Sequence, residues 1–242
     1  SKALGDWKAP DNWYQRSIEE RNKWDEYVAK ESGPTNQELP SYAHAVGAVY
    51  RNSDPSDIVV TAAGGLVGEV VQIWKPKELN TFETEWGFSC MGYEISGALG
   101  IKMAKPNQDV IVFVGDGSYL LQNSDIYSSV LYNKKLIIVV CDNGGHMVIN
   151  RLQLAKGGKE YLCNLRSART SNLEFVDFEA HAKSMGANAE TVKSTSELEA
   201  AFKRAKASNK TYVISMLTHG YEWLDGTAFW ESPTLEVHSN TE

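Results

Sequence analysis

Cysteine and long apolar runs are both scarce in this chain of 242 residues. The three cysteines are an odd number, and no two of them are spaced as a Cys-x-x-Cys pair. This argues against a disulfide framework and against a zinc site built on cysteine pairs. The longest apolar runs are about as long as a strand, far short of the roughly 20 residues that a membrane helix needs. We therefore expect a cytoplasmic protein with no membrane partner.

Basic residues are also fewer than acidic residues. The chain has 24 Lys and Arg against 31 Asp and Glu, a formal net charge of −7. A basic stripe is needed to bind a phosphate backbone, and the densest basic stretch, at 203–206, is short. We therefore expect no nucleic-acid partner. Hydrophobic residues make up 42% of the chain, enough for a globular core without covalent staples.

Three segments of different character divide the chain: an arm over 1–35, a domain over 36–220 and an irregular tail over 221–242. The arm is rich in charge and contains three tryptophans. Apolar residues at helical spacing predict a helix over 12–30. We expect this helical arm to pack on the domain, because its tryptophans would otherwise face water.

Strands and helices alternate through the domain. We expect strands at 57–61, 81–83, 110–114, 136–141, 189–192 and 211–217. We expect helices at 41–51, 66–73, 91–104, 123–132, 178–185 and 196–207. Two of the strands are apolar throughout, which is typical of the middle of a sheet that is covered on both faces. The pattern predicts an α/β fold with an open, mostly parallel sheet and helices on both faces.

Two glycine-rich turns follow the strands expected at 110–114 and 136–141. The first reads Gly-Asp-Gly-Ser and contains Asp116, and the second reads Asp-Asn-Gly-Gly and contains Asn143. One helix and one strand separate them, so the two turns should be neighbours at the carboxyl edge of the sheet, where ligands bind in such folds. Mg²⁺ prefers oxygen ligands and takes several of them from phosphates and water. Glycines let a backbone approach a bulky anion closely.

The GDG motif, followed 27 residues later by an asparagine turn, resembles the diphosphate-binding motif of thiamine diphosphate enzymes. This resemblance implies the thiamin diphosphate-binding fold, with thiamine diphosphate and Mg²⁺ as cofactors. Asp116 and Asn143 would bind the metal through their side chains, and Gly145 through its carbonyl. The cofactor-binding residues that the resemblance implies are Gly64, Gly65, Ser89, Met91, Gly115, Gly117, Ser118, Asn143 and Gly145.

Three of these positions have distinct roles by the same resemblance. Ser118 would touch the diphosphate, and the carbonyl of Ser89 would accept a hydrogen bond from the aminopyrimidine ring. Met91 would lie beneath the cofactor and hold its two rings together, and the alternative is a core methionine at a helix start.

The segment 83–153 resembles one group within these enzymes in particular. It contains WGFSCMGYEI, VGDGSYLLQNSDI and NRLQ, which look like the trihydroxycyclohexane-dione hydrolases of inositol breakdown, as does the Phe-Trp-Glu-Ser-Pro stretch of the tail. The resemblance implies C–C bond cleavage of a polyol diketone, trihydroxycyclohexane-1,2-dione, to give 5-deoxyglucuronate. The chain departs from the pattern after Asn143, where His146 and Met147 stand in place of a small residue.

The family also uses a glutamate from a separate pyrimidine-binding domain, and no segment here resembles that domain. We read Glu69, Glu85 and Glu94 as ordinary solvated charges, so the catalytic residues stay unassigned. The missing initiator methionine fits a C-terminal domain of a longer enzyme, inactive when isolated. The expected partners are the polyol diketone substrate, the pyrimidine-binding domain of the same or another chain, and copies in a homodimer or tetramer.

Two alternatives remain open for the function. One is an acetolactate-synthase-like carboligase or decarboxylase, which would use the same cofactor. The other is a non-catalytic phosphate-binding α/β module. The absence of a GxGxxG motif after the first strand argues against this second alternative.

Several single residues also stay open. His146 is either a general acid or base or a histidine facing solvent or a neighbour. The three arginines in and beside the loop 156–172 are either substrate contacts or surface groups: Arg151, Arg166 and Arg169. We expect that loop to be a mobile lid, and we expect Cys90 and Cys141 to be unreactive.

Overall fold

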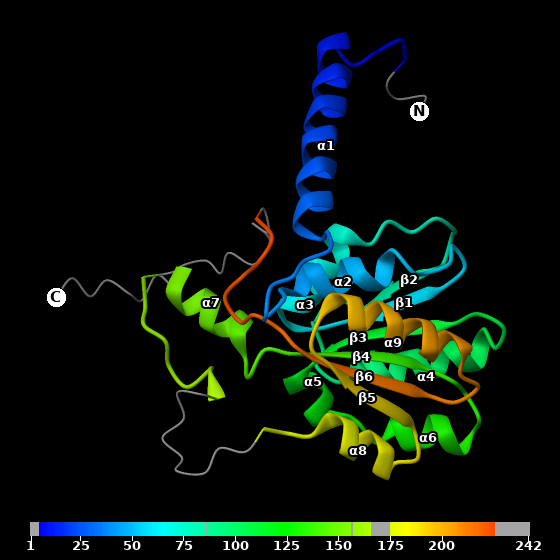
Figure 1. Cartoon of the computed structure of the whole chain (residues 1–242). Helices are drawn as coiled ribbons and strands as arrows, with labels where there is room; N and C mark the ends of the chain where they lie inside the picture. Colours follow the sequence, from blue (N-terminus) through cyan, green and yellow to red (C-terminus); the bar gives the residue numbers. More distant parts are fainter. Residues whose placement is uncertain (1–4, 86, 156, 166–174, 226–242) are drawn as a thin grey trace.

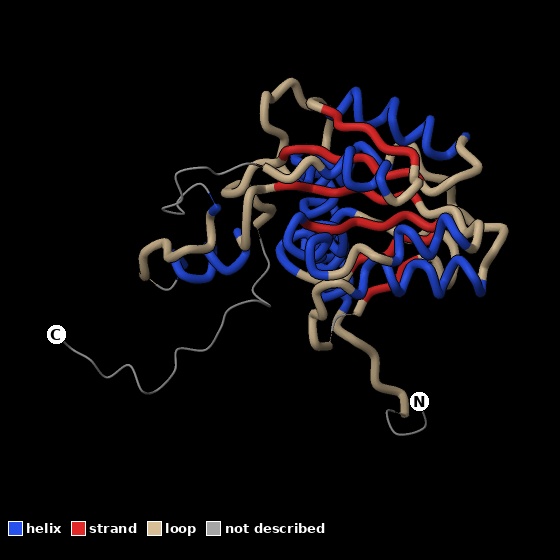
Figure 2. The backbone as a smooth tube through the Cα atoms, turned by 90° about the horizontal axis from the view of Figure 1, so that it is seen from below, coloured by secondary structure: helices blue, strands red, loops and turns tan. Residues whose placement is uncertain are grey.

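The computed structural model describes residues 5–85, 87–155, 157–165 and 175–225. Its centre is a six-stranded sheet in the order β2-β1-β3-β4-β6-β5. The strands are β1 (Ile58–Thr61), β2 (Phe82–Thr84), β3 (Val110–Gly115), β4 (Ile137–Asp142), β5 (Asn188–Val192) and β6 (Tyr212–Leu217). Every pairing between them is parallel, and Figure 2 shows them side by side. The predicted open α/β sheet is confirmed, with no antiparallel pairing among the described strands.

Helices cover both faces of the sheet and produce two separate core layers (Figure 1). One layer lies under α2 (Tyr42–Tyr50), α3 (Gly64–Ile73) and α9 (Thr195–Ala207). The other lies under α4 (Tyr93–Ala104), α6 (Asp125–Leu131) and α8 (Phe178–Ser184). Successive side chains of a strand point to opposite faces, so Phe113 enters the first layer and Val112 the second. A strand buried on both faces must be apolar throughout, which explains the runs seen in the sequence.

Two helices were not predicted, and one begins later than expected. α5 (Asp116–Leu121) is only six residues long, and α7 (Met147–Ala155) mixes polar and apolar residues after a glycine turn. α5 begins inside the GDG motif, at Asp116, and α7 begins at Met147, just after the asparagine motif. α4 begins at Tyr93 because Gly92, with φ of +97°, is left-handed and stands outside the helix.

The predicted helical arm is present as α1 (Asp11–Glu31), but its packing on the domain was predicted wrongly for most of its length. Figure 1 shows α1 projecting from the sheet and its helices. Trp7 and Trp13 are 61% and 63% exposed, and only the last turns approach the domain, where Val28 is buried. A straight helix that leaves the domain at one end cannot bring its outer turns back to it.

Some predictions lie outside the described residues. They are the Phe-Trp-Glu-Ser-Pro stretch of the tail, Arg166, Arg169, and the parts of the loop 156–172 at 156 and 166–172. The domain limits at 35 and 220 stay a prediction. Among the described helices, none is both long and apolar enough to cross a membrane.

Candidate functional site

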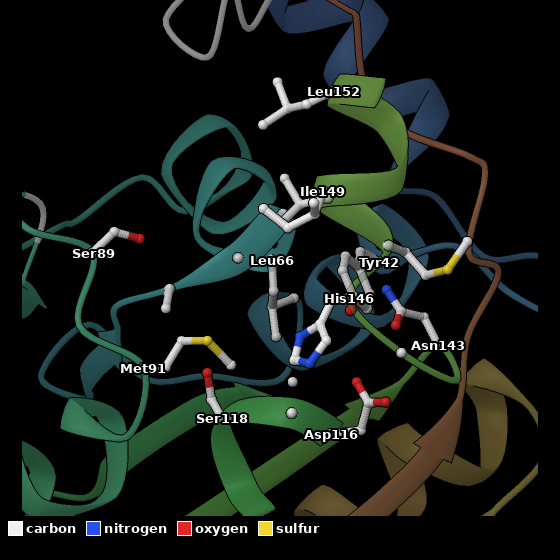
Figure 3. Close-up of a pocket in the computed structure, with 18 residues that line it drawn as sticks. Tyr42, Leu66, Ser89, Met91, Asp116, Ser118, Asn143, His146, Ile149 and Leu152 are labelled. Carbon is white, nitrogen blue, oxygen red and sulfur yellow. The ribbon is translucent and has the colours of Figure 1, made fainter. Parts of the chain in front are cut away.

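A pocket of about 190 Å³ opens at the carboxyl edge of the sheet, beside the point between β1 and β3 where the strand order reverses. Ligands bind at this switch point in open α/β folds. All ten residues that the sequence proposed for cofactor or metal line this one pocket: Gly64, Gly65, Ser89, Met91, Gly115, Asp116, Gly117, Ser118, Asn143 and Gly145. They come from four loops that are far apart in the sequence, and Figure 3 shows the labelled side chains around one space.

The two glycine-rich turns are neighbours, as the single crossover between them predicted. Gly115 is paired in register with Cys141, so Asp116 and Asn143 follow adjacent strand ends. The Asp116 side chain is 5% exposed and accepts hydrogen bonds from the backbone N–H groups of Gly117 and Gly145. Burial raises the pKa of Asp116 to about 7, and the nearby Asp142 carboxylate contributes to the rise. Without a cation beside it, this carboxyl group is therefore harder to ionise than one in water.

The side chain of Asn143 contributes a hydrogen-bond acceptor that has no donor among the described residues. Its Oδ1 atom is buried and has no hydrogen-bond partner within the described part of the chain. An unpaired buried acceptor is unfavourable unless a cation or donor satisfies it. The donor set of carboxylate, amide oxygen and backbone carbonyl fits Mg²⁺. It does not depend on clustered acidic or histidine ligands, and among the described residues no three His, Cys, Asp or Glu side chains form a metal-sized group.

The turn that carries Asn143 is held from outside by the described part of the predicted lid. Gly145 forms an isolated bridge with Asn164, and the His146 N–H donates to the Cys163 carbonyl at 2.8 Å. A side chain at Gly145 would bring its Cβ to 2.2 Å from that same carbonyl oxygen. The residue at 145 must therefore be glycine for this turn and its neighbour to pack as they do.

The floor of the pocket leaves little room for a side chain at 117. A Cβ at Gly117 would lie 3.1 Å from the His146 ring and 3.2 Å from Cε of Met91. Gly64, at the start of α3, has a φ of +76° that side chains rarely adopt. The first turn of α3 thus presents bare backbone to the pocket, which is how helix N-termini accept phosphate groups.

The loop before α4 carries Ser89 and Met91 to the pocket. Glu85 accepts the N–H groups of Phe88 and Cys90 at 2.9 and 2.7 Å and so closes this loop. Met91 is 39% exposed and lines the pocket, so the alternative of a core methionine is wrong.

The two cysteines near the site fit the prediction that they are unreactive. The Glu85 side chain raises the pKa of Cys90, and burial raises the pKa of Cys141. A raised pKa lowers the thiolate fraction, and the thiolate is the nucleophile.

His146 and α7 form the remaining wall (Figure 3). The His146 ring lies in the pocket against Gly117 and is exposed there, so both interpretations, a general acid or base and a histidine that faces solvent or a neighbour, stay predictions. Four apolar residues of α7 line the same wall and were missed because the helix was not predicted: Met147, Val148, Ile149 and Leu152. Arg151 lies elsewhere, 5.2 Å above the Trp223 ring, and does not line the pocket.

Two glutamates that the sequence led us to read as solvated charges are in fact buried. Glu69 and Glu94 are each 1% exposed. Burial raises the pKa of Glu69 to about 7 and also raises that of Glu94. Glu94 precedes the buried Ala98 by one helical turn, so helical spacing was a signal that could have placed it on the inner face. Glu85 is half-buried and stays a loop charge.

Comparison with known proteins agrees with this geometry. Residues 62–216 match the family described as "Thiamine pyrophosphate enzyme, C-terminal TPP binding domain". The chain is 38% identical over 190 residues to the 3D-(3,5/4)-trihydroxycyclohexane-1,2-dione hydrolase of Halalkalibacterium halodurans, covering 76% of this chain and 29% of that protein. It is 34% identical over 223 residues to the protein of that name from Listeria innocua, covering 92% of this chain and 35% of that protein.

A solved structure gives the same fold. The Rhodococcus jostii RHA1 thiamine diphosphate-dependent 4-hydroxybenzoylformate decarboxylase superposes with a TM-score of 0.68 at 18% identity, over 76% of this chain and 34% of that one. At that identity the likeness concerns the fold alone. The chain spans about a third of the length of the curated relatives it matches. Because the family model matches residues 62–216, which is more than half of the chain, the chain belongs to the C-terminal TPP-binding domains of thiamine pyrophosphate enzymes.

Proposed function

We propose that this chain is the diphosphate-binding domain of a 3D-(3,5/4)-trihydroxycyclohexane-1,2-dione hydrolase and that it binds thiamine diphosphate together with Mg²⁺. The names of its relatives support the reaction. The observation that carries the binding site is the buried, unpartnered Oδ1 of Asn143 beside the Asp116 carboxylate in the shared pocket. The substrate in this proposal is the polyol diketone, whose ring opens by C–C bond cleavage to 5-deoxyglucuronate.

Each residue has a defined task in this proposal. The side chains of Asp116 and Asn143 and the carbonyl of Gly145 supply three metal oxygens, which leaves room in an octahedral shell for phosphate oxygens and water. The N–H groups at the start of α3, at Gly64 and Gly65, and the Ser118 hydroxyl bind the diphosphate.

The rest of the pocket orients the organic part of the cofactor. The Ser89 carbonyl accepts a hydrogen bond from the aminopyrimidine, and Met91 supports the rings. The apolar residues of α7 exclude water from the reacting centre. When bound, thiamine diphosphate supplies the electron sink that cleavage of a C–C bond beside a carbonyl requires.

The proposal includes a partner domain and an oligomer. The exposed side of α5 and α6 carries Leu121 at 63%, Tyr127 at 56% and Leu131 at 64% exposure. Apolar groups gathered on a protein surface mark interaction sites. A pyrimidine-binding domain that supplies the activating glutamate would cover them, in a homodimer or tetramer. Light scattering of the longer protein measures the assembly, and limited proteolysis tests the domain limits at 35 and 220.

Calorimetric titration of thiamine diphosphate, with Mg²⁺ and then with a chelator, tests the binding site. We expect metal-dependent binding that Asp116→Ala and Asn143→Ala abolish. Asp11→Ala, which removes an exposed carboxylate at the start of α1, is the matched control and should bind like the unchanged chain. If nothing binds, the titration is repeated with the upstream region of the protein restored. Continued absence of binding in that longer protein contradicts the proposal.

The carboligase or decarboxylase alternative keeps the same cofactor site and is separated by substrate. The longer protein is incubated with pyruvate and with the cyclic diketone, and carbon dioxide and ring-opened product are measured. Carbon dioxide release from pyruvate favours the alternative, and diketone opening without it favours the hydrolase.

A further inference from the structure

A buried carboxylate lies directly behind the pocket wall without lining it. Glu94 is in the first turn of α4 and is 1% exposed. Its Oε1 atom accepts the backbone N–H of Ala63 at 3.2 Å, and its Oε2 atom accepts the backbone N–H of Gly92 at 2.8 Å. The Ser118 hydroxyl interacts with the same carboxyl group. One side chain therefore contacts three segments of the chain: the loops that contain Ala63 and Gly92, and the first turn of α5.

Each of the three segments contributes pocket residues, and none is joined to another by a short stretch of chain. Ala63 lies between β1 and α3 and precedes Gly64. Gly92 lies between β2 and α4 and follows Met91. Ser118 is itself a pocket residue after β3. Their relative placement must therefore come from contacts across the fold, and Glu94 supplies a contact to all three.

The chemistry of these contacts suits a carboxylate and no other side chain of its size. Both backbone partners are donors, so both side-chain oxygens must accept. Glutamine has one acceptor oxygen, and its NH₂ group would face an N–H of Ala63 or Gly92. Hydrogen bonds to an ionised group are about twice as strong as neutral ones, and a buried charge is tolerated only when it is paired in this way.

We propose that Glu94 is a positioning residue that holds the loops at Ala63 and Gly92 and the first turn of α5 in the arrangement that binds the diphosphate end of the cofactor. The part of this inference that concerns cofactor affinity rests on the proposed function. The part that concerns the loops rests on the hydrogen bonds alone. The two parts are tested by different measurements.

The first measurement is amide hydrogen exchange in the chain without cofactor. In Glu94→Gln one of the two amides loses its acceptor, so exchange at Ala63 or Gly92 should accelerate at least about tenfold. Exchange in the strands β3 and β4 should stay as in the unchanged chain. Glu94→Asp keeps both acceptors on a side chain one methylene shorter and should give an intermediate effect.

The second measurement is the affinity for thiamine diphosphate with Mg²⁺, by calorimetry. Glu94→Gln should weaken it by at least about tenfold, and Glu94→Asp should weaken it less. The matched control is Asp57→Asn. Asp57 is 4% exposed and bonded to Lys206, but it lies at the amino end of β1, away from the pocket, so its loss should leave the affinity unchanged.

The outcomes are distinct. Unchanged exchange at Ala63 and Gly92 in Glu94→Gln, or acceleration spread evenly over the whole chain, overturns the positioning role. If Glu94→Gln does not fold, Glu94→Asp decides by the same two criteria. If the unchanged protein binds no cofactor, the proposed function fails while local acceleration at the two amides still supports the loop contacts. If the cofactor binds equally well to the unchanged chain and to Glu94→Gln, the inference about affinity is wrong.

Discussion

Replacing Glu69 with glutamine should make the chain harder to unfold at alkaline pH. The side chain is 1% exposed in the middle of α3, and Oε1 accepts the Leu224 N–H at 3.0 Å. Oε2 has no hydrogen-bond partner among the described residues. Burial raises the pKa of Glu69 to about 7, against the N–H of Leu224 and the charge of Arg151, which lower it. The folded chain therefore prefers the neutral form of this carboxyl group.

The size and sign of the effect follow from linkage. A carboxyl group whose pKa rises from 4.5 to about 7 on folding binds its proton more tightly in the folded state. Stability is then lost as the pH rises from 4.5 to 7, and the loss reaches about 3 kcal/mol once both states are ionised. Glutamine keeps the acceptor for Leu224 and has no charge to bury, so the variant escapes this loss.

Urea unfolding at pH 5 and pH 8, without Mg²⁺, measures the prediction. The free energy of unfolding of Glu69→Gln, minus that of the unchanged chain, should be about 2–3 kcal/mol larger at pH 8 than at pH 5. The titration of Asp116 cancels because both proteins contain it. Glu190→Gln is the control: hydrogen bonding to Arg204 lowers the pKa of Glu190 below 4.5, so its effect on stability changes with pH mainly below pH 4.5, and its difference from the unchanged chain should be nearly the same at pH 5 and pH 8. A difference for Glu69→Gln that is the same at both pH values would refute the reasoning.

Three further substitutions test the pocket and its surroundings. Gly117→Ala places a Cβ about 3 Å from two pocket side chains that can shift, so the melting temperature should change little while calorimetry shows weaker cofactor binding. Gly145→Ala clashes with backbone at 2.2 Å and should lower both the melting temperature and the affinity, whereas Gly144→Ala meets open space and should cost only about 1 kcal/mol of backbone strain; equal effects would be inconsistent with the turn as described. Lys206→Met leaves the buried Asp57 carboxylate without its ion pair, so urea unfolding should show a loss of about 3 kcal/mol with unchanged cofactor affinity, and a neutral result would mean that the pair does not stabilise the chain.

The sheet and the place of the pocket were accessible from the sequence because both depend on short patterns. Apolar runs at 110–114 and 136–141 predicted two central strands, and the structure has them as β3 and β4. Glycine turns directly after those strands marked the carboxyl edge where Asp116 and Asn143 meet. A strand buried on both faces is apolar throughout, and a turn with bare backbone is rich in glycine. Both can therefore be recognised from a few consecutive residues.

The helices around the pocket were harder to predict. α5 has only six residues and contains a glycine of the GDG motif, and α7 mixes polar and apolar residues, so helical periodicity is hard to recognise in either. The packing of α1 was misjudged because tryptophan content indicates surface that should be covered, while the sequence does not say what covers it. Trp13 is exposed in this chain.

The sequence by itself determined the parallel α/β sheet and the two metal-type turns, because each is encoded by neighbours along the chain. The family resemblance added ten of the residues that line the pocket. Only the tertiary structure decided that Glu69 and Glu94 are buried, that the His146 ring lies against Gly117, and that Oδ1 of Asn143 has no partner. Burial and hydrogen bonding of a polar side chain depend on groups brought close by the fold. Ala63 is 31 residues from Glu94, and no pattern around either residue records that they meet.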